Sequence, residues 1–226
     1  MPLPNRNKSG ISVRNNATEP KKRDVQKLID LFNSGNLSEA EKQGYRSLKS
    51  FPSSFAVLNI LAGTLFTLKK WSPAIAVYDE ALAINPNYEV GRFNQAVAYE
   101  ELNNLDEAIR HYSDALEINP DFHQALLNRG LTYERQGNHR AALSDFFHFR
   151  KLTGDLKSYH KEGNAHFNLG NFEGAEAIYN AIIKSSPSNV ETIFSLGNIS
   201  LARGDYKSAI NRYEKCLSID PEDQAV

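Results

Sequence analysis

Apolar residues recur along this chain at helical spacing, in blocks that are separated by short polar turns. The stretch NLDEAIRHYSDALEINPDF, residues 104–122, has the pattern of one amphipathic helix that ends at a proline. A near copy, WSPAIAVYDEALAINPNY, occupies residues 71–88, so that Tyr78 corresponds to Tyr112 at a distance of 34 residues. A pattern that returns at a fixed period indicates an array of similar structural units.

Aligning the copies on this proline divides most of the chain into six repeats. Each repeat carries two apolar stripes at a spacing of about 3.6 residues, separated by a polar turn such as ELNNLD or RQGNHR. We therefore expect a pair of antiparallel helices in each repeat and about twelve helices in all. The repeats are residues 21–54, 55–88, 89–122, 123–155, 156–189 and 190–223, preceded by residues 1–20 and followed by a tail of residues 224–226.

Four positions of the repeat keep one kind of side chain. Small residues at positions 8 and 20 allow the two helices to approach closely, an aromatic ring at position 24 fills the gap to the next repeat, and proline at position 32 ends the second helix. Position 20 is Ala40, Ala74, Ala108, Ala142, Ala175 and Ala209. Position 24 is Tyr78, Tyr112, Phe146, Tyr179 and Tyr213 in all but the first repeat. Position 8 is Ala62, Ala96, Gly130, Gly163 and Gly197, and position 32 is Pro52, Pro86, Pro120, Gly154, Pro187 and Pro221.

This combination resembles the tetratricopeptide repeat (TPR) family, whose pattern has a small residue at 8, Ala at 20, an aromatic residue at 24 and Pro at 32. The resemblance covers about nine-tenths of the chain. It implies an all-α fold, a right-handed α–α superhelix (the TPR solenoid) of about twelve antiparallel helices. The first repeat departs from the pattern with Leu28 at position 8 and Gly44 at position 24, as expected of a terminal repeat with one neighbour.

Local signals predict where single helices begin and end. Gly137, Gly170 and Gly204 follow the first stripe of their repeats, and we expect each to end a helix in the left-handed conformation. Ser72 followed by Pro73 predicts a helix start, with a capping hydroxyl and then proline at the first helical position. One helix pair buries too little apolar surface to offset its lost conformational entropy, so each repeat needs its neighbours.

The resemblance also implies a binding surface, because in this family the first helix of each repeat lines the inner, concave wall. Positions 2, 5, 6, 9, 12 and 13 of the family pattern face that groove. Asparagine is informative there, since its amide both donates and accepts hydrogen bonds and can pair with the main chain of an extended peptide. The candidate peptide-binding residues are Asn59, Phe93, Asn94, Gln124, Leu127, Asn128, Lys157, His160, Lys161, Asn164 and Asn198, with Phe194 and Ser195 also at groove positions.

The carboxylate clamp of chaperone-binding TPR arrays is incomplete in this chain. Asn128, Lys157 and Lys161 match three of its five positions, whereas Phe93 and Val97 stand where Lys and Asn are needed. A co-chaperone function is therefore disfavoured. The candidate face instead changes from apolar residues to polar and basic ones along the chain, so we expect it to suit a peptide with apolar anchors and an acidic end.

Composition and charge set further limits. The 226 residues are 41% hydrophobic with a formal net charge of -1, which points neither to nucleic acid nor to an acidic membrane as a partner. Residues 1–20 are interpreted as a disordered basic arm, with contact to phosphates or anionic lipid as the alternative. The sequence shows no signal peptide and no membrane span, and it holds a single cysteine, Cys216, so the expected location is the cytoplasm.

The residue patterns do not suggest catalysis. The histidines lack the spacing of metal ligands, the glycines fall at helix ends rather than in a phosphate-binding loop, and Cys216 occupies a core position of the last repeat. Phe146 and Phe149 also hold core positions, whereas Phe147 is expected to face outward. We therefore predict no catalytic, cofactor-binding or metal-binding residue and no enzyme activity.

The leading functional prediction is a scaffold that binds another protein or an extended peptide in the concave groove. Stretches such as KLIDLFNSGNLSEAEKQ also resemble TPR arrays that precede the catalytic domain of bacterial glycosyl- and sulfotransferases. The alternative is thus the substrate-presenting region of a larger enzyme. The chain stops at PEDQAV without the polar helix that commonly covers the last repeat of such arrays. We expect either a longer protein or an uncapped end face that pairs with another copy.

Overall fold

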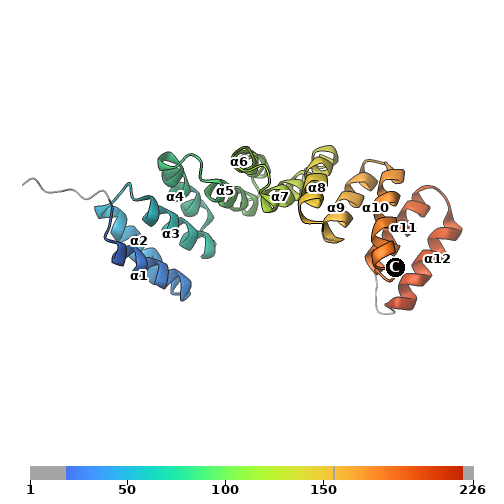
Figure 1. Ribbon diagram of the computed structural model, residues 1–226, viewed down its shortest axis with the longest axis horizontal. Coiled ribbons are helices and arrows are strands. Elements are labelled where there is room, and N and C mark those ends of the chain that lie inside the picture. Colours follow the sequence, from blue (N-terminus) through green and yellow to red (C-terminus); the bar gives the residue numbers. More distant parts are fainter. Residues whose placement is uncertain (1–18, 155, 221–226) are drawn as a thin grey trace, which may run out of the picture. The chain divides into compact units, whose positions relative to one another are not determined.

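The computed structural model describes residues 19–154 and 156–220, and these residues form helices and no strand (Figure 1). The helices are α1 (Lys22–Asn33), α2 (Leu37–Ser50), α3 (Phe55–Thr67), α4 (Trp71–Ile84), α5 (Glu89–Glu101), α6 (Leu105–Ile118), α7 (His123–Arg135), α8 (His139–Thr153), α9 (Leu156–Asn168), α10 (Phe172–Ser185), α11 (Val190–Ala202) and α12 (Tyr206–Ile219). The all-α class is as expected. Most of the basic arm, residues 1–18, and the tail, residues 224–226, lie outside the described residues.

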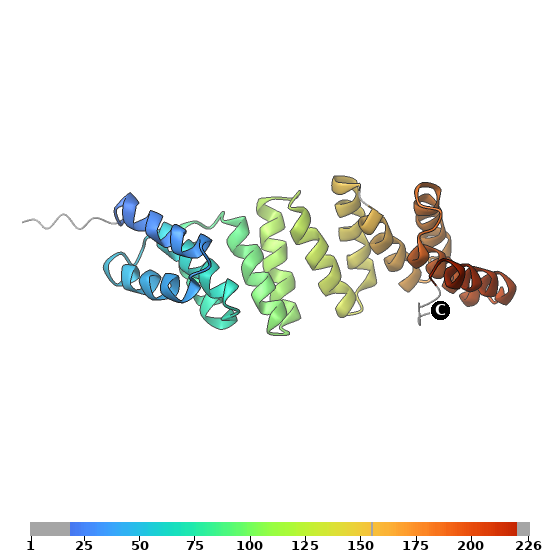
Figure 2. The same cartoon turned by 90° about the horizontal axis from the view of Figure 1, so that it is seen from below.

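The chain divides into two compact parts after Asn85. In the N-terminal part α1 packs on α2 and α3, α2 packs on α3, and α3 packs on α4. In the C-terminal part each helix from α5 to α12 packs on the next one along the chain, and α9 also contacts α11 (Figures 1 and 2). Each part is therefore a stack of helix pairs whose neighbours in space are neighbours in sequence.

The repeated positions identified in the sequence form the core. All six position-20 alanines are at most 1% exposed, and so are the position-24 rings of the second to fifth repeats. In the later repeats the ring lies directly against the position-8 glycine. A Cβ added at Gly163 would lie 2.5 Å from Cε1 of Tyr179, and one at Gly197 would lie 2.5 Å from Cε1 of Tyr213. These glycines are needed because the ring fills the space that a side chain would take.

The turn inside each repeat has the same backbone conformation. Gly137, Gly170 and Gly204 have φ angles of 73°, 72° and 77°, as predicted, and Gly35 has the same left-handed conformation. The second and third repeats place Lys69 and Asn103 there, each at φ 57°. A side chain in this conformation is strained, because its Cβ crowds the carbonyl oxygen.

The predicted start of α4 is wrong by a few residues. The helix begins at Trp71 with Lys70 as its N-cap, so Ser72 lies inside the first turn and does not cap it. Pro73 is still within the first turn, where a missing N–H costs nothing. The aromatic ring of Trp71 packs edge-on against Phe66 at a centroid distance of 5.3 Å.

A buried ion pair within the fourth repeat is also hydrogen-bonded to the third repeat. Arg129 on α7 donates two hydrogen bonds to Asp145 on α8, at 2.8 and 2.7 Å, and a third to Ser113 Oγ on α6 at 2.9 Å. Asp145 is almost fully buried. A bidentate pair of this kind satisfies a carboxylate that would otherwise be costly to remove from water.

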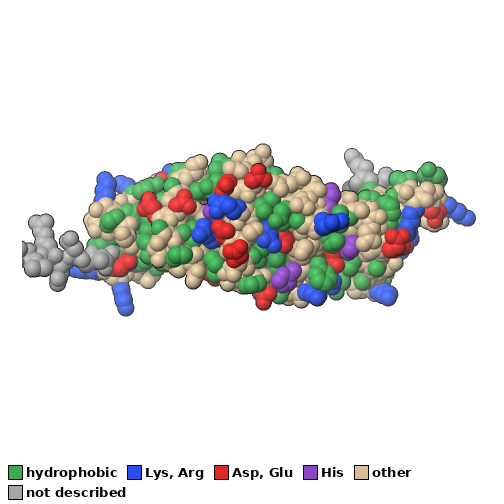
Figure 3. All heavy atoms as spheres, turned by 90° about the horizontal axis from the view of Figure 1, so that it is seen from above, with side chains coloured by type: hydrophobic (Ala, Val, Ile, Leu, Met, Phe, Trp, Pro, Cys, Tyr) green, Lys and Arg blue, Asp and Glu red, His purple; other side chains and the backbone are tan. Residues whose placement is uncertain are grey.

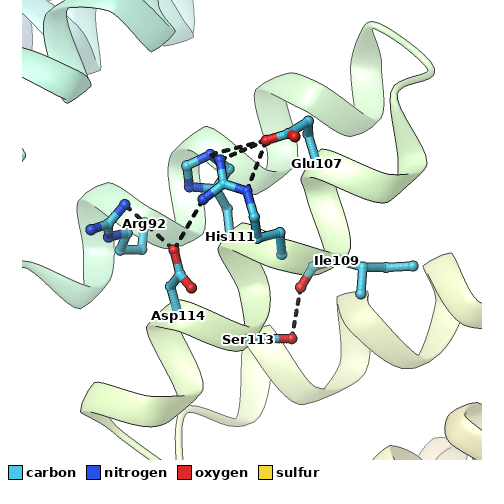
Figure 4. Close-up of polar contacts among 7 residues, drawn as sticks. Arg92, Glu107, Ile109, His111, Ser113 and Asp114 are labelled. Carbon is cyan, nitrogen blue, oxygen red and sulfur yellow. Dashed lines mark hydrogen bonds and ion pairs between the residues drawn. The ribbon is translucent and has the colours of Figure 1, made fainter.

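A second charged cluster joins α5 and α6 (Figure 4). Arg110 donates hydrogen bonds to Glu107, and its guanidinium also lies 3.4 Å from Asp114 Oδ2. Asp114 Oδ2 is at the same distance from Arg92 Nη1 on α5. Arg110 also lowers the pKa of Glu107, chiefly through their hydrogen bond.

His111 lies buried inside this cluster. Its ring stacks on Tyr99 with the centroids 5.1 Å apart, and Arg110 Nη2 donates to its Nε2 over 2.7 Å. Burial, and then the positive charge of Arg110, lower the pKa of His111 from 6.5 to about 4. The folded protein therefore holds this imidazole neutral down to acidic pH.

Lys69→Gly is expected to raise the free energy of unfolding by about 0.5–1 kcal/mol. The substitution relieves the left-handed strain, and the greater entropy of glycine in the unfolded chain offsets part of that gain. Urea unfolding followed by circular dichroism measures the change. Lys69→Ala is the matched control, because it removes the same side chain and keeps the strained Cβ. Equal stability of the two variants would contradict the prediction.

The unfolding free energy is expected to fall by about 3 kcal/mol through His111 as the pH drops from 6.5 to 4. The unfolded chain takes up a proton at about pH 6.5, whereas the folded protein does so only near pH 4, so acid favours unfolding in this window. His111→Phe keeps an aromatic ring on Tyr99 and should flatten the pH profile. His123→Phe, at an exposed position, is the matched control for the chemical change itself. Parallel profiles for the wild type and His111→Phe would refute the prediction.

Candidate functional site

The predicted binding residues lie on the first helices of their repeats. Asn59 is on α3 in the N-terminal part. The others are in the C-terminal part: Phe93 and Asn94 on α5, Gln124, Leu127 and Asn128 on α7, Lys157, His160, Lys161 and Asn164 on α9, and Phe194, Ser195 and Asn198 on α11. These residues on α5, α7, α9 and α11 are called the A-helix face below.

Position 5 of the repeat is fixed by aromatic contact with position 24. The ring centroids of Phe93 and Tyr112 are 5.7 Å apart, and those of Phe194 and Tyr213 are 5.5 Å apart. His160 takes the equivalent place against Tyr179 at 5.4 Å. The position-5 side chains therefore pack partly in the core. This packing sets their orientation, and only the remaining part of each side chain could contact a ligand.

The tyrosine hydroxyls at position 24 are held by residues of the A-helix face. Tyr179 donates to Asn164 Oδ1 over 2.6 Å, and Tyr213 donates to Asn198 Oδ1 over 2.8 Å. Burial raises the pKa of Tyr179 to about 12, so its hydroxyl keeps its proton and acts as a donor. The two asparagines have the same role in their repeats.

Asn128 contacts the position-24 tyrosine of the preceding repeat, and it does so with the opposite polarity. Tyr112 donates to Glu100 Oε2 over 3.0 Å, and the Tyr112 oxygen accepts from Asn128 Nδ2 at 3.3 Å. An amide has a donor end and an acceptor end, so each of these bonds uses one end of the side chain. A tyrosine hydroxyl thus orients each of Asn128, Asn164 and Asn198.

His160 connects two repeats rather than standing alone. Its Nδ1 lies 3.1 Å from Glu191 Oε1, and its Nε2 lies 3.3 Å from Ser195 Oγ, both on α11. Burial lowers the pKa of His160, and the charge of Glu191 opposes this effect. The contact of His160 with Glu191 and Ser195 could not be predicted from the sequence, because these two residues belong to the next repeat, about 30 residues further along the chain.

This Ser–His–Glu arrangement has the connectivity of a nucleophilic triad, but its surroundings do not support hydrolysis. Ser195 Oγ also donates to the backbone oxygen of Glu191 over 2.9 Å, within its own helix. Ser195 lies in the interior of α11, where the backbone N–H groups serve the helix and do not form an oxyanion site. We interpret the three residues as a contact between the fifth and sixth repeats.

The basic end of the face is partly balanced by acidic groups. Lys157 is exposed and Lys161 is half-buried. Burial raises the pKa of Glu134 on α7, while the nearby charge of Lys161 lowers it. The surface drawn in Figure 3 likewise carries Lys, Arg, Asp and Glu side chains next to one another rather than a patch of one sign. Lys161 thus lies near an acidic side chain.

A separate cavity of about 800 Å³ lies in the N-terminal part, between α1 and α2. Leu28, Leu31 and Phe51 are among its apolar lining residues, and Lys27 and Arg46 are among its charged ones. None of the predicted binding residues lines it. The sequence signal that could have indicated it is the first repeat's departure from the repeat pattern at its small and aromatic positions.

Neither a metal site nor a membrane-spanning helix is found in the described part of the chain. Residues 19–154 and 156–220 contain no group of three or more His, Cys, Asp or Glu side chains placed to hold a metal ion. In the same residues no helix has the length and apolar character needed to cross a bilayer. Cys216 is buried in the core, as expected, with Sγ 3.6 Å from the backbone oxygen of Val190.

Solved structures of similar fold include proteins described as TPR proteins. A tetratricopeptide repeat protein from Parabacteroides merdae has a TM-score of 0.68 at 23% identity, over 87% of this chain and 78% of that one. YrrB, described as a TPR protein with an unusual peptide-binding site, has a TM-score of 0.70 at 16% identity, over 80% of this chain and 93% of its own. PilF of Pseudomonas aeruginosa has a TM-score of 0.62 at 17% identity, over 88% and 91%. At such low identity the likeness concerns the fold alone.

Sequence comparison gives the family. A search of curated proteins found no matching sequence. A profile described as tetratricopeptide repeat matches residues 26–89 and 160–223, which is more than half of the chain. A second profile of that description matches residues 77–110, and one described as TPR repeat matches residues 96–137. The repeat pattern, the stacked helix pairs and these matches agree, and the chain belongs to the tetratricopeptide repeat family.

Proposed function

We propose that this protein is a non-catalytic scaffold that binds an extended peptide or a segment of another protein on its A-helix face. The observation that carries the proposal is the series of oriented amides on α7, α9 and α11. Asn128, Asn164 and Asn198 are each fixed at one end by a tyrosine hydroxyl. Fixed amides reduce the entropy lost on binding and can pair with a peptide backbone of any sequence.

The chemistry of the ligand follows from the rest of the face. Phe93 and Leu127 are half-buried apolar side chains on the earlier helices of the C-terminal part, and Lys157 and Lys161 supply positive charge on α9. A peptide with apolar side chains toward one end and carboxylates toward the other would match both features. Among proteins of similar fold, YrrB is described as having a peptide-binding site, which supports the class of ligand and not its identity.

Four finer points remain predictions. The first is the absence of enzyme activity: the TPR fold generally serves protein interaction rather than catalysis, and the Ser195–His160 contact does not support hydrolysis. A cytoplasmic location and the substrate-presenting alternative, within a glycosyl- or sulfotransferase, rest on sequence patterns alone. A second copy of this chain is a further partner, through the end of the sixth repeat, which is a surface separate from the A-helix face.

Reversing the two lysines is expected to weaken peptide binding about tenfold, because each lost attraction is replaced by a repulsion. Binding would be measured by fluorescence anisotropy with an extended peptide that carries leucines in its first half and glutamates in its second. Lys157→Glu combined with Lys161→Glu is the test protein. Lys184→Glu combined with Lys215→Glu makes the same change of net charge away from the face. Equal affinity of the two variants would count against the proposed surface.

Asn164→Ala is expected to lower the affinity for the same peptide about fivefold, through loss of one hydrogen bond to its backbone. The alanine variant also removes the bond from Tyr179, so the control must separate these effects. Tyr179→Phe breaks the same bond but keeps the amide of Asn164. It should bind within about twofold of the wild type. If both variants lose affinity alike, Asn164 supports the tyrosine and does not touch the ligand.

A further inference from the structure

Helix α12 carries an apolar stripe in which three of the four side chains are exposed. Tyr206, Ile210 and Leu217 are 66%, 55% and 41% exposed, and Tyr213, half-buried, lies between them in sequence. Their spacing of four, three and four residues puts all four on one side of a helix. An exposed apolar row of this length is unusual on a protein surface and indicates an interaction site.

The equivalent positions are covered in the other repeats of the C-terminal part. In the third repeat they are Leu105, Ile109, Tyr112 and Leu116, all buried or half-buried, and α7 packs on that helix. In the fifth repeat Tyr179 and Ile183 belong to the cluster that includes Leu196 on α11. The stripe on α12 is therefore the surface on which a further helix normally packs, and the described residues supply none there.

The stripe has the pattern of a coiled-coil seam. Tyr206, Ile210, Tyr213 and Leu217 occupy successive d, a, d and a positions of a heptad. Lys207 and Glu214 then fall at the two e positions, and both are exposed. The g positions are Ala209 and Cys216, which are buried against the rest of the repeat. The e flank of the seam thus carries one positive and one negative side chain, and the g flank is buried.

We propose that α12 pairs with α12 of a second copy of this chain in an antiparallel arrangement. Two-fold symmetry then places Tyr206 against Leu217 of the partner subunit, and Ile210 against Tyr213 of the partner subunit. A C2 interface of this kind uses the same patch on both chains and closes at the dimer. The proposal is independent of peptide binding, because it uses no residue of the A-helix face.

The charges at the e positions select this orientation. In an antiparallel pair e faces e, so Lys207 meets Glu214 of the partner subunit and the pairing occurs twice. In a parallel pair e faces g, where Ala209 and Cys216 offer no charge and are buried. Opposite charges set the partner and register of a helix pair more than its affinity. A second copy therefore fits both the apolar row and its charged flank.

The dimer is expected to be weak. A pair of 14-residue helices buries less than the roughly 1,200–2,000 Å² of a stable standard interface. We therefore expect a dissociation constant on the order of 10 μM, which a concentration series can detect.

Sedimentation velocity over about 1–200 μM tests the pairing. The wild type is expected to change from monomer to dimer within this range. Lys207→Glu places glutamate against glutamate twice, and Glu214→Lys places lysine against lysine twice, so each variant alone should associate at least about tenfold more weakly. An equimolar mixture of the two variants should form a heterodimer, because every facing pair is then of opposite charge. Lys215→Glu, at an exposed position outside the seam, is the control and should dimerise like the wild type.

Three results would overturn the proposal. The first is a wild type that stays monomeric across the series. The second is association that neither charge reversal weakens. The third is association that is weakened by the reversals but not restored by mixing them, as expected if α12 bound head to tail to another surface of the second chain. Far-ultraviolet circular dichroism of each variant establishes that the helices are intact, so a loss of association cannot be attributed to unfolding.

Discussion

The contact on which this structure depends is the one between the position-24 ring and the small residue at position 8. In the fourth to sixth repeats a ring carbon lies only 2.5–2.6 Å from where the Cβ of a residue larger than glycine would be, so the two helices of a repeat pack closely along that line. The other side of the ring is covered by the next repeat, and Tyr112 and Tyr179 reach at most 1% exposure only because of that neighbour. No pair of helices completes its own core, and the stability of each repeat includes its interface with the next.

The same ring links the core to the candidate binding face. Its body is buried between helices, while its hydroxyl reaches the A-helix face and fixes an amide there, as in the bonds of Tyr179 to Asn164 and of Tyr213 to Asn198. Core packing thus orients the groups proposed to contact a peptide, without a separate supporting network. Successive repeats thus carry oriented amides, which are the groups proposed to pair with the backbone of an extended chain.

Helix α12 shows one consequence of this repeating pattern. The residues of α12 follow the repeat pattern, so they offer an apolar surface for a following helix even where the described chain provides none. In the first repeat the pattern changes instead, with Leu28 at the small position and Gly44 at the aromatic one. A Cβ at Gly44 would lie 3.0 Å from Leu61 Cδ1, so the glycine lets the next repeat approach. The first and the sixth repeat therefore present different surfaces at their outer sides.

The sequence alone determined the helix pairs, the core positions and the family, because a 34-residue period with alanine and aromatic residues at fixed places can be counted without coordinates. It also placed the left-handed turns at Gly137, Gly170 and Gly204, where backbone conformation depends on a single residue. Only the tertiary structure decided what the polar residues do. His160 meets Glu191 and Ser195 of the next repeat, and Asn164 is bound by a tyrosine of its own repeat. Such contacts join residues that are 15 to 35 positions apart, so they depend on how the helices pack, which local pattern does not specify.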